Sequence, residues 1–280
     1  MTIAIQQSND WAPHFYKQSP IFDPISLQAK TFNHFYEWPD LSDYNQLLQK
    51  KHSNIKSLYG SELNFIHQAG KPETINDEYE VRIYKTGEIQ TRLHNWHDFF
   101  QVMVWSSFPI TKKIINKLHA TALISRKNST ASNQRSLVEN SLTLFDECGA
   151  IIICSNKKLI NLIKNFSWKE LFITHRTAFE REIKCLVFGH AMFEKTLNPY
   201  IGMTAHSILL TVDHEFFTLN HQAQNNHIDK LAARYFSEVN EINTKILQPF
   251  PILGVPGWDI RNESPDFYDN KEYFRSKPNK

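Results

Sequence analysis

The pair formed by His190 and Glu194 is one of two histidine–carboxylate pairs in this sequence that are suited to chemistry. The two residues are four positions apart in the stretch Ala178–Leu197, where apolar residues recur at helical spacing. Both side chains therefore point from one face of the expected helix, and that face is mostly apolar. Burying a polar group costs about 2–7 kcal/mol unless it finds a partner. The pair is therefore either a core hydrogen-bonding network or part of a binding site.

The second pair, His97 and Asp98, follows Asn95 at the expected start of another helix. With Asn95 as the N-cap, Asp98 occupies the third helical position, where unpaired backbone N–H groups and the helix dipole favour an anion. Asp98 also has an ordinary structural role there, as a capping-box partner. His97 would have an ordinary structural role if its ring formed a hydrogen bond with a neighbouring side chain. Helix capping does not require a histidine, so His97 is the stronger candidate for a functional role.

Together these pairs predict a metal-dependent hydrolase that acts on phosphoesters or nucleic acid. Imidazoles and carboxylates without thiolates suit Mg²⁺, Mn²⁺, Zn²⁺ or Fe²⁺, so a divalent metal ion is the candidate cofactor. Such an ion lowers the pKa of bound water and makes a nucleophile of it. A shared site requires His97 and His190 to lie within about 12 Å of each other. The predicted centre contains His97, Asp98, His190 and Glu194, with Asp146 and His206 as further candidate metal ligands. Asp146 also has an ordinary explanation as a turn residue.

The alternative is a binding module without catalysis. Residues 99–169 contain ten Lys or Arg and three acids, a local net charge of +7, although the whole chain carries only +2. This basic segment would bind nucleic acid or another phosphate-bearing ligand, unless the fold places acidic residues beside it. The proline-containing tail Pro249–Trp258 would offer a groove to a partner protein, or wrap its own core with Trp258 as the anchor.

Several common classes are disfavoured. No run of 18 apolar residues occurs, so we expect no membrane span, and Met1–Trp11 lacks the pattern of a secretory signal. The three cysteines contain no C-x-x-C motif, which favours reduced thiols in a cytoplasmic protein. Only 8 of 280 residues are Gly, and no P-loop or dinucleotide-binding motif is present.

The apolar pattern predicts one α+β domain over residues 1–280, with its core at about 20–275 and short extensions at both ends. We expect a mixed sheet and two β-hairpins, at Tyr79–Leu93 with its turn at Gly87, and at Leu142–Cys154. Strands are also expected at Leu63–His67 and Ser207–Val212, and a loop at Ser125–Asn140. Helices are expected at Ile25–Tyr36, Ser42–Ile55, Trp96–Val104, Ile110–Leu123, Lys157–Phe166, Trp168–Thr174, Ala178–Leu197 and Ile228–Val239.

Four motifs also carry a resemblance to a known family. They are Asn95-Trp96-His97-Asp98-Phe99-Phe100, Leu144-Phe145-Asp146-Glu147, Phe188-Gly189-His190-Ala191 and the tail Pro251–Trp258. In combination they resemble a bacterial family numbered 3025 among the domains of unknown function, over about Pro20 to Arg275. His94 departs from the family pattern, which has Asn at that position. The resemblance implies a bacterial protein with a single domain, and it implies no activity, ligand or mechanism.

Overall fold

A four-stranded mixed sheet organises the structure, a computed structural model that describes residues 10–51, 55–129 and 134–278. The strand order is β4–β3–β5–β6. Its central strand β3 (Gly149–Cys154) is buried along its whole length and pairs parallel to β5 (Thr204–Thr211). The outer strands β4 (Ile183–Val187) and β6 (Gln248–Pro251) pair antiparallel to β3 and β5. A continuous apolar run such as that of β3 is typical of a strand covered on both faces.

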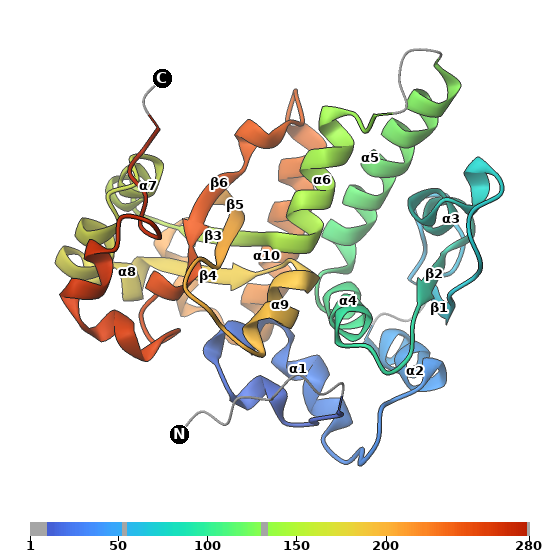
Figure 1. The fold of residues 1–280 in the computed structure, drawn as a ribbon, viewed down its shortest axis with the longest axis horizontal. Helices are drawn as coiled ribbons and strands as arrows, with labels where there is room; N and C mark the ends of the chain where they lie inside the picture. Colours follow the sequence, from blue (N-terminus) through green and yellow to red (C-terminus); the bar gives the residue numbers. More distant parts are fainter. Residues whose placement is uncertain (1–9, 52–54, 130–133, 279–280) are drawn as a thin grey trace.

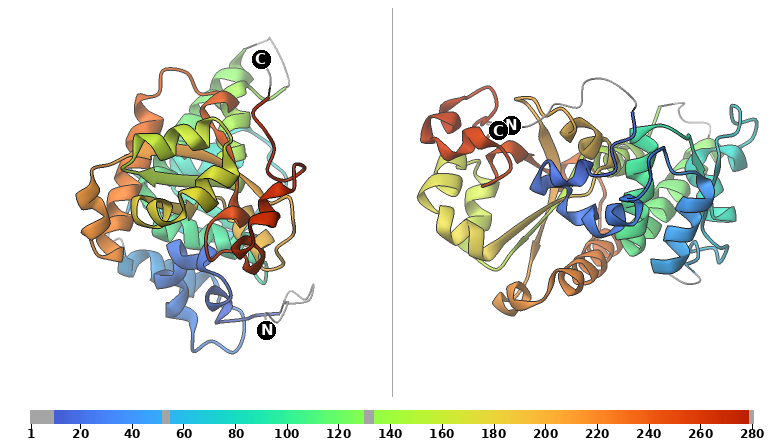
Figure 2. Two further views of the ribbon diagram at one scale, coloured as in Figure 1. Left: turned by 90° about the vertical axis from the view of Figure 1, so that its left-hand side faces the viewer. Right: turned by 90° about the horizontal axis from the view of Figure 1, so that it is seen from below.

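Helices and irregular segments cover this sheet. Both views in Figure 2 place α10 and the C-terminal segment on opposite sides of the sheet. Beyond α6 and α5 lies a small parallel sheet of β1 (Asn64–His67) and β2 (Glu88–Thr91) with α3 (Figure 1). The helix bounds are α1 Ser26–Ala29, α2 Leu41–Lys51, α3 Tyr79–Thr86, α4 Trp96–Ser107, α5 Pro109–Asn128, α6 Leu137–Cys148, α7 Lys157–Lys164, α8 Arg176–Glu182, α9 His190–Thr196 and α10 His221–Glu238.

The α+β class and the mixed sheet are confirmed, but the first expected hairpin is wrong. Its first half forms helix α3, and β2 pairs parallel to β1 instead. Val81 and Tyr84 are three residues apart, and in the helix they pack near Leu123 of α5. The short run therefore fitted both the two-residue repeat of a strand and the 3.6-residue repeat of a helix. Gly87 has a φ of 77° and caps the C-terminus of α3, where a glycine is favoured.

The second expected hairpin is also wrong, because its first half belongs to α6. A capping box of Ser136 and Glu139 starts this helix, which runs to Cys148 and leads directly into β3. The long helix expected over Ala178–Leu197 is divided into α8, strand β4 and α9. Pairing of β4 with β3 overrides the helical spacing of its apolar residues, since tertiary context outweighs local preference.

Most of the other expected elements are present. The helices expected after Asn95, after Pro109, at Lys157 and at Ile228 correspond to α4, α5, α7 and α10, and the strands at Leu63 and Ser207 to β1 and β5. The expected loop Ser125–Asn140 is largely helical, since α5 reaches Asn128 and α6 begins at Leu137. Residues 130–133 of this expected loop lie outside the described residues. Residues 52–54 of the expected helix Ser42–Ile55 also lie outside them. The region Ile25–Tyr36 holds only α1 and a 3₁₀ turn.

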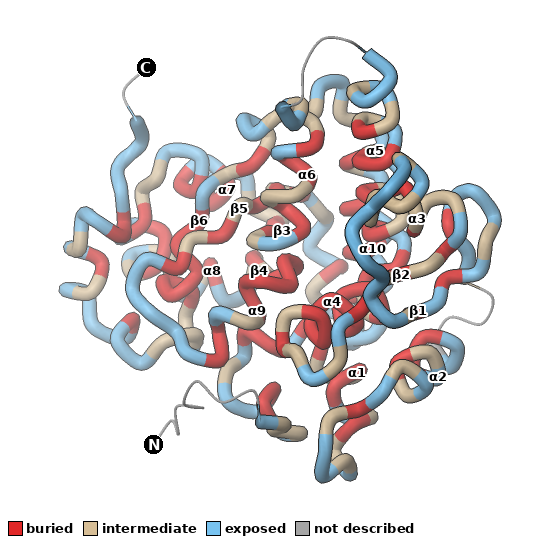
Figure 3. The backbone as a smooth tube through the Cα atoms, turned by 45° about the vertical axis from the view of Figure 1, so that its right-hand side comes forward, coloured by how far each residue is buried: buried red, intermediate tan, exposed pale blue. Residues whose placement is uncertain are grey.

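A continuous apolar cluster connects the two ends of the described chain, from Phe15 to Phe274. Figure 3 shows that its buried residues concentrate in the strands and along the inner sides of α4 and α5. Within the described residues, no helix combines the length and apolar character that a membrane span requires. The core therefore gives rigid support to the polar side chains that lie at its edge.

Candidate functional site

A polar pocket of about 230 Å³ lies where α3, α5, α6 and α9 meet beside α4. Titratable and amide side chains dominate its wall. Those used below are Glu78, Tyr79, Glu80, Gln101, Arg135, Asp146, Glu147 and His190. A small cavity lined by converging polar groups is the usual form of a binding or catalytic site.

Two glycines bring Asp146 and His190 together at this pocket. Asp146 lies in the last turn of α6, and His190 is the first residue of α9. Antiparallel pairing of β3 with β4 places Gly149 beside Gly189, whose backbone N–H donates to the Gly149 carbonyl. A β-carbon at Gly189 would collide with the Glu147 carbonyl oxygen, so only glycine permits this close approach.

Helix α4 positions His97 on the other side of His190. Asn95 caps the helix by accepting a hydrogen bond from the Asp98 backbone N–H. Phe100, one turn after His97, stacks on Phe193 of α9 with ring centroids 5.8 Å apart. This aromatic contact holds α4 against α9, so that His97 faces both His190 and Glu194.

Polar side chains then form a row, here called the histidine chain, in which neighbours are joined by hydrogen bonds or an ion pair except at one close approach. Glu194 Oε2 lies 2.9 Å from His97 Nδ1, and His97 Nε2 lies 3.0 Å from His190 Nε2. His190 Nδ1 lies 3.6 Å from Asp146 Oδ2, and the Lys112 ammonium pairs with the other Asp146 oxygen. The 3.6 Å separation is too long for a direct hydrogen bond. Among the described residues, His190 Nδ1 therefore has no hydrogen-bond partner.

The histidine chain runs from the surface to the interior. The exposed fraction of the side chain is 44% for Glu194, 32% for His97 and 6% for His190. Lys112 at the far end is 5% exposed, and its ammonium lies 5.0 Å from the centre of the Trp105 ring. Charge at the Glu194 end is therefore well solvated, whereas charge at the Lys112 end depends on the protein for compensation.

These surroundings drive the pKa values of the two histidines apart. The hydrogen bond to Glu194 raises the pKa of His97, although burial opposes this effect. Burial lowers the pKa of His190 to about 4, and the charge of Lys112 acts in the same direction. Burial alone would raise the pKa of Asp146, but the Lys112 ammonium outweighs it and keeps this carboxyl ionised. A protein separates pKa values in this way at sites of proton transfer.

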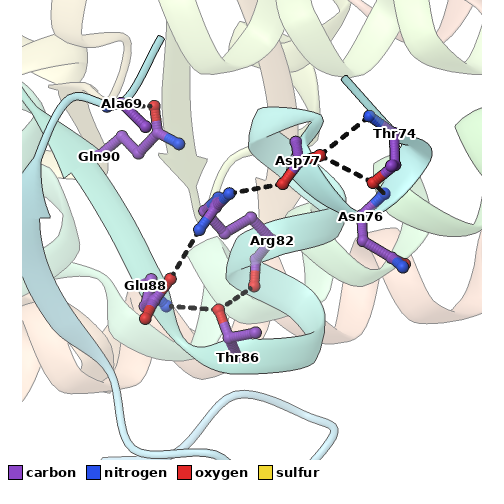
Figure 4. Close-up of polar contacts among 8 residues, drawn as sticks. All are labelled: Ala69, Thr74, Asn76, Asp77, Arg82, Thr86, Glu88 and Gln90. Atoms are coloured by element: carbon purple, nitrogen blue, oxygen red, sulfur yellow. Dashed lines mark hydrogen bonds and ion pairs between the residues drawn. The ribbon is translucent and has the colours of Figure 1, made fainter. Parts of the chain in front are cut away.

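Helix α3 supplies the opposite wall, and an ion-pair network fixes it in place. Figure 4 shows Arg82 between Asp77 and Glu88, with nitrogen–oxygen distances of 2.8 and 2.9 Å. This helix presents Tyr79, whose hydroxyl is buried and lines the pocket together with Gln101. It also presents Glu80, which accepts a hydrogen bond from Asn116.

The structure brings four of the six predicted site residues together and places two elsewhere. His97, Asp146, His190 and Glu194 belong to the histidine chain. The Asp98 carboxylate is paired with Arg92, at 2.8 Å, and accepts a hydrogen bond from the Arg92 backbone N–H. His206 lies in β5 and lines a different groove, beside Trp168. Asp98 therefore anchors the segment before α4, and His206 faces another part of the surface.

Sequence reasoning missed the residues that α3 contributes to the pocket and the lysine that α5 contributes to the histidine chain. Lys112 was assigned only to the basic segment, and Tyr79 and Glu80 to a hairpin. The available signal was the helical spacing of Lys112, Asn116 and His119, which places three polar side chains on the buried face of α5. The basic segment itself is partly neutralised, because Lys112, Arg126, Lys127 and Lys169 pair with Asp146, Glu139, Glu78 and Asp269.

The donor groups also bear on the predicted metal ion. Within the part of the chain that the structure describes, no group of three or more His, Cys, Asp or Glu residues is arranged to hold one. The two facing imidazole nitrogens are 3.0 Å apart and have hydrogen-bonding geometry. In this structure the contact is a hydrogen bond between the rings.

One family model matches residues 63–278, and its description is protein of unknown function (DUF3025). The chain belongs to the DUF3025 family. The resemblance of the four motifs is thereby confirmed, and every residue of the histidine chain lies within the matched region. No curated protein and no solved structure matches the chain significantly. His94, where the DUF3025 pattern suggested Asn, has a φ of 54°, a left-handed conformation that Asn adopts more readily than most residues.

Proposed function

We propose that this DUF3025 protein is a hydrolase in which His190 activates a water molecule in the polar pocket. The observation that carries the proposal is the unpartnered Nδ1 of His190, which is buried and lies at the pocket wall. A histidine whose other ring nitrogen is held by a hydrogen bond is the usual form of a general base. Asp146, 3.6 Å away, lines the same pocket, where a water molecule would reach both side chains.

The pocket supports a small uncharged substrate. Four carboxylates line it, from Glu78, Glu80, Asp146 and Glu147. Lys127 and Lys112 pair with Glu78 and Asp146, which leaves two carboxylates against the guanidinium of Arg135. This excess of negative charge repels phosphate groups, and a volume of about 230 Å³ is small even for a ligand pocket. We therefore propose an ester or amide of low molecular weight, in preference to a phosphoester or nucleic acid.

Two chromogenic probes and two histidine variants test the proposal. We expect the full-length protein to hydrolyse 4-nitrophenyl acetate faster than bis(4-nitrophenyl) phosphate. His190→Gln should lower the rate by about 10²–10⁴-fold, the usual contribution of a general base. His206→Gln is the matched control, because it changes a histidine in another groove, and its rate should stay within twofold of wild type.

Two outcomes would contradict the proposal. One is ester hydrolysis that does not exceed the rate in buffer, and the other is equal activity in wild type and His190→Gln. Repeating the assay after dialysis against a chelator, with elemental analysis of the protein, separates water activation by His190 from activation by a metal ion. Activity that persists without metal supports His190, whereas activity restored only by a divalent ion supports the metal-dependent hydrolase that the sequence predicts.

A further inference from the structure

The contact between His97 and His190 has a consequence for proton transfer. Glu194 accepts a hydrogen bond from His97 Nδ1–H, which leaves Nε2 as the only ring nitrogen of His97 that faces His190. One proton lies between the two Nε2 atoms, which are 3.0 Å apart. Its position therefore decides which nitrogen of His190 carries a hydrogen, and so whether Nδ1 in the pocket is a base or an acid.

His190 alone is poorly placed to hold a positive charge. The charged groups that face it are Asp146 on α6, Lys112 on α5 and His97 on α4. Burial and the Lys112 ammonium oppose its protonation, which would make His190 a weak base on its own.

His97 has surroundings that favour a positive charge. The groups that face it are Glu194 on α9, Asp98 on α4 and Arg92 before α4, and the carboxylates prevail over Arg92. Its side chain is also one-third exposed, so solvent stabilises the imidazolium. The histidine that touches the pocket and the histidine that can hold a charge are therefore different residues joined by one hydrogen bond.

We propose that His97 and His190 act together as one base, in which His190 accepts a proton from the pocket and passes another to His97. The proposal rests on the proposed function for the source of the proton. The bound water gives a proton to His190 Nδ1, and the proton on His190 Nε2 moves to His97 Nε2. The hydroxide attacks the substrate carbonyl, and the imidazolium forms at His97 beside Glu194. The reverse transfers return a proton from His190 Nδ1 to the leaving group.

Glu194 is a positioning residue in this scheme, and Glu194→Gln tests it without disturbing the core, because the side chain is 44% exposed. Glu241→Gln is the matched control, since it removes an exposed carboxylate that belongs neither to the pocket nor to the histidine chain. With ¹⁵N-labelled histidine in the full-length protein, we expect a through-hydrogen-bond coupling between the two Nε2 nuclei. The pKa of His97 should fall in Glu194→Gln and stay unchanged in Glu241→Gln.

The kinetic test uses 4-nitrophenyl acetate. Glu194→Gln should lower kcat at least tenfold with little change in KM, and should shift the pH–rate profile to lower pH. Absence of the nitrogen–nitrogen coupling, together with a His97 pKa that is the same in wild type and His190→Gln, would overturn the relay even if the protein is a hydrolase. A coupling that is present without any hydrolysis would retain the proton pathway and reject the proposed function.

Discussion

Two buried polar networks in this protein differ in the kind of group that they contain. The histidine chain joins ionisable side chains to one another across α4, α5, α6 and α9. The second network, here called the tail network, consists of Asn262, Tyr268 and Tyr273 in the C-terminal segment. It joins neutral side chains to backbone groups: Asn262 donates to the carbonyls of Leu253 and Val255, Tyr268 to that of Gly254 and Tyr273 to that of Met203.

The difference separates a structural network from one that can do chemistry. Each tyrosine hydroxyl of the tail network donates a hydrogen bond to a backbone carbonyl. Burial raises the pKa of both tyrosines, so neither ionises near neutral pH. The histidine chain instead holds groups whose protonation can change, and its His190 lines a pocket. The tail network therefore holds Pro249–Trp258 against the chain's own core by hydrogen bonds. The histidine chain consists of groups that can exchange protons.

Lys112→Met should be the most damaging change to the histidine chain. It leaves the Asp146 carboxylate buried beside His190 without its main cation. Loss of one partner from a buried ion pair typically costs about 3–5 kcal/mol. We expect a loss of that size in the free energy of unfolding, measured with urea at pH 7.

The neighbouring Lys113→Met is the matched control, and it should change stability by about 0.5 kcal/mol or less. The double variant Lys112→Met with Asp146→Asn should recover at least half of the loss, because no uncompensated charge then remains. A loss below about 1 kcal/mol in the single variant would mean that solvent reaches Asp146, and that the pair is not a buried one.

The sequence predicted the members of the histidine chain better than the elements that carry them. His190 and Glu194 share a helix as expected, although that helix is the short α9 and not a long one. The residue types of His190 and Glu194, and the helix face that they share, can be read from the local sequence. The strand β4 that precedes them was hidden, because its apolar residues also fit a helical period and only pairing with β3 selects the strand.

Lys112, Tyr79 and Glu80 were missed for a different reason. Each becomes part of the site only when α3 and α5 pack beside α6, and no local pattern reports such long-range proximity. The tail network was likewise invisible, because its acceptors are backbone carbonyls that have no sequence signature. The prediction that the tail wraps its own core came from its prolines and apolar residues alone, and burial of Leu253 and Val255 agrees with it.

Acid should weaken the histidine chain through His190. Its pKa is about 4 in the folded protein, below the ordinary value of about 6.5 expected on unfolding. The unfolded chain therefore binds a proton first, so this contribution to stability is complete above about pH 6.5 and is lost as the pH falls towards 4. At about 1.4 kcal/mol per pKa unit, the loss is about 3 kcal/mol.

Urea unfolding at pH 7, 5.5 and 4 measures this effect. His190→Gln should reduce the loss of stability between pH 7 and pH 4, whereas His67→Gln, which changes an exposed histidine, should show the wild-type loss. Part of the loss should persist in His190→Gln, because burial also lowers the pKa values of His206 and His221. If His190→Gln and wild type lose stability in parallel, then folding does not lower the pKa of His190, and the separation of the two histidine pKa values is wrong.

Tyr273→Phe should have the smallest effect of the three and should not depend on pH. The variant removes the hydroxyl that accepts from the Leu253 N–H at 2.9 Å and donates to the Met203 carbonyl at 2.7 Å. Two buried backbone groups lose a partner while the shape of the ring is kept, so we expect a loss of about 2 kcal/mol. Because burial raises the pKa of this phenol, the loss should be equal at pH 5 and pH 8. Tyr36→Phe, at a side chain that is 99% exposed, is the control for the substitution itself. A pH-dependent loss, or a change in ester hydrolysis, would mean that the two networks are coupled and that the tail is part of the site.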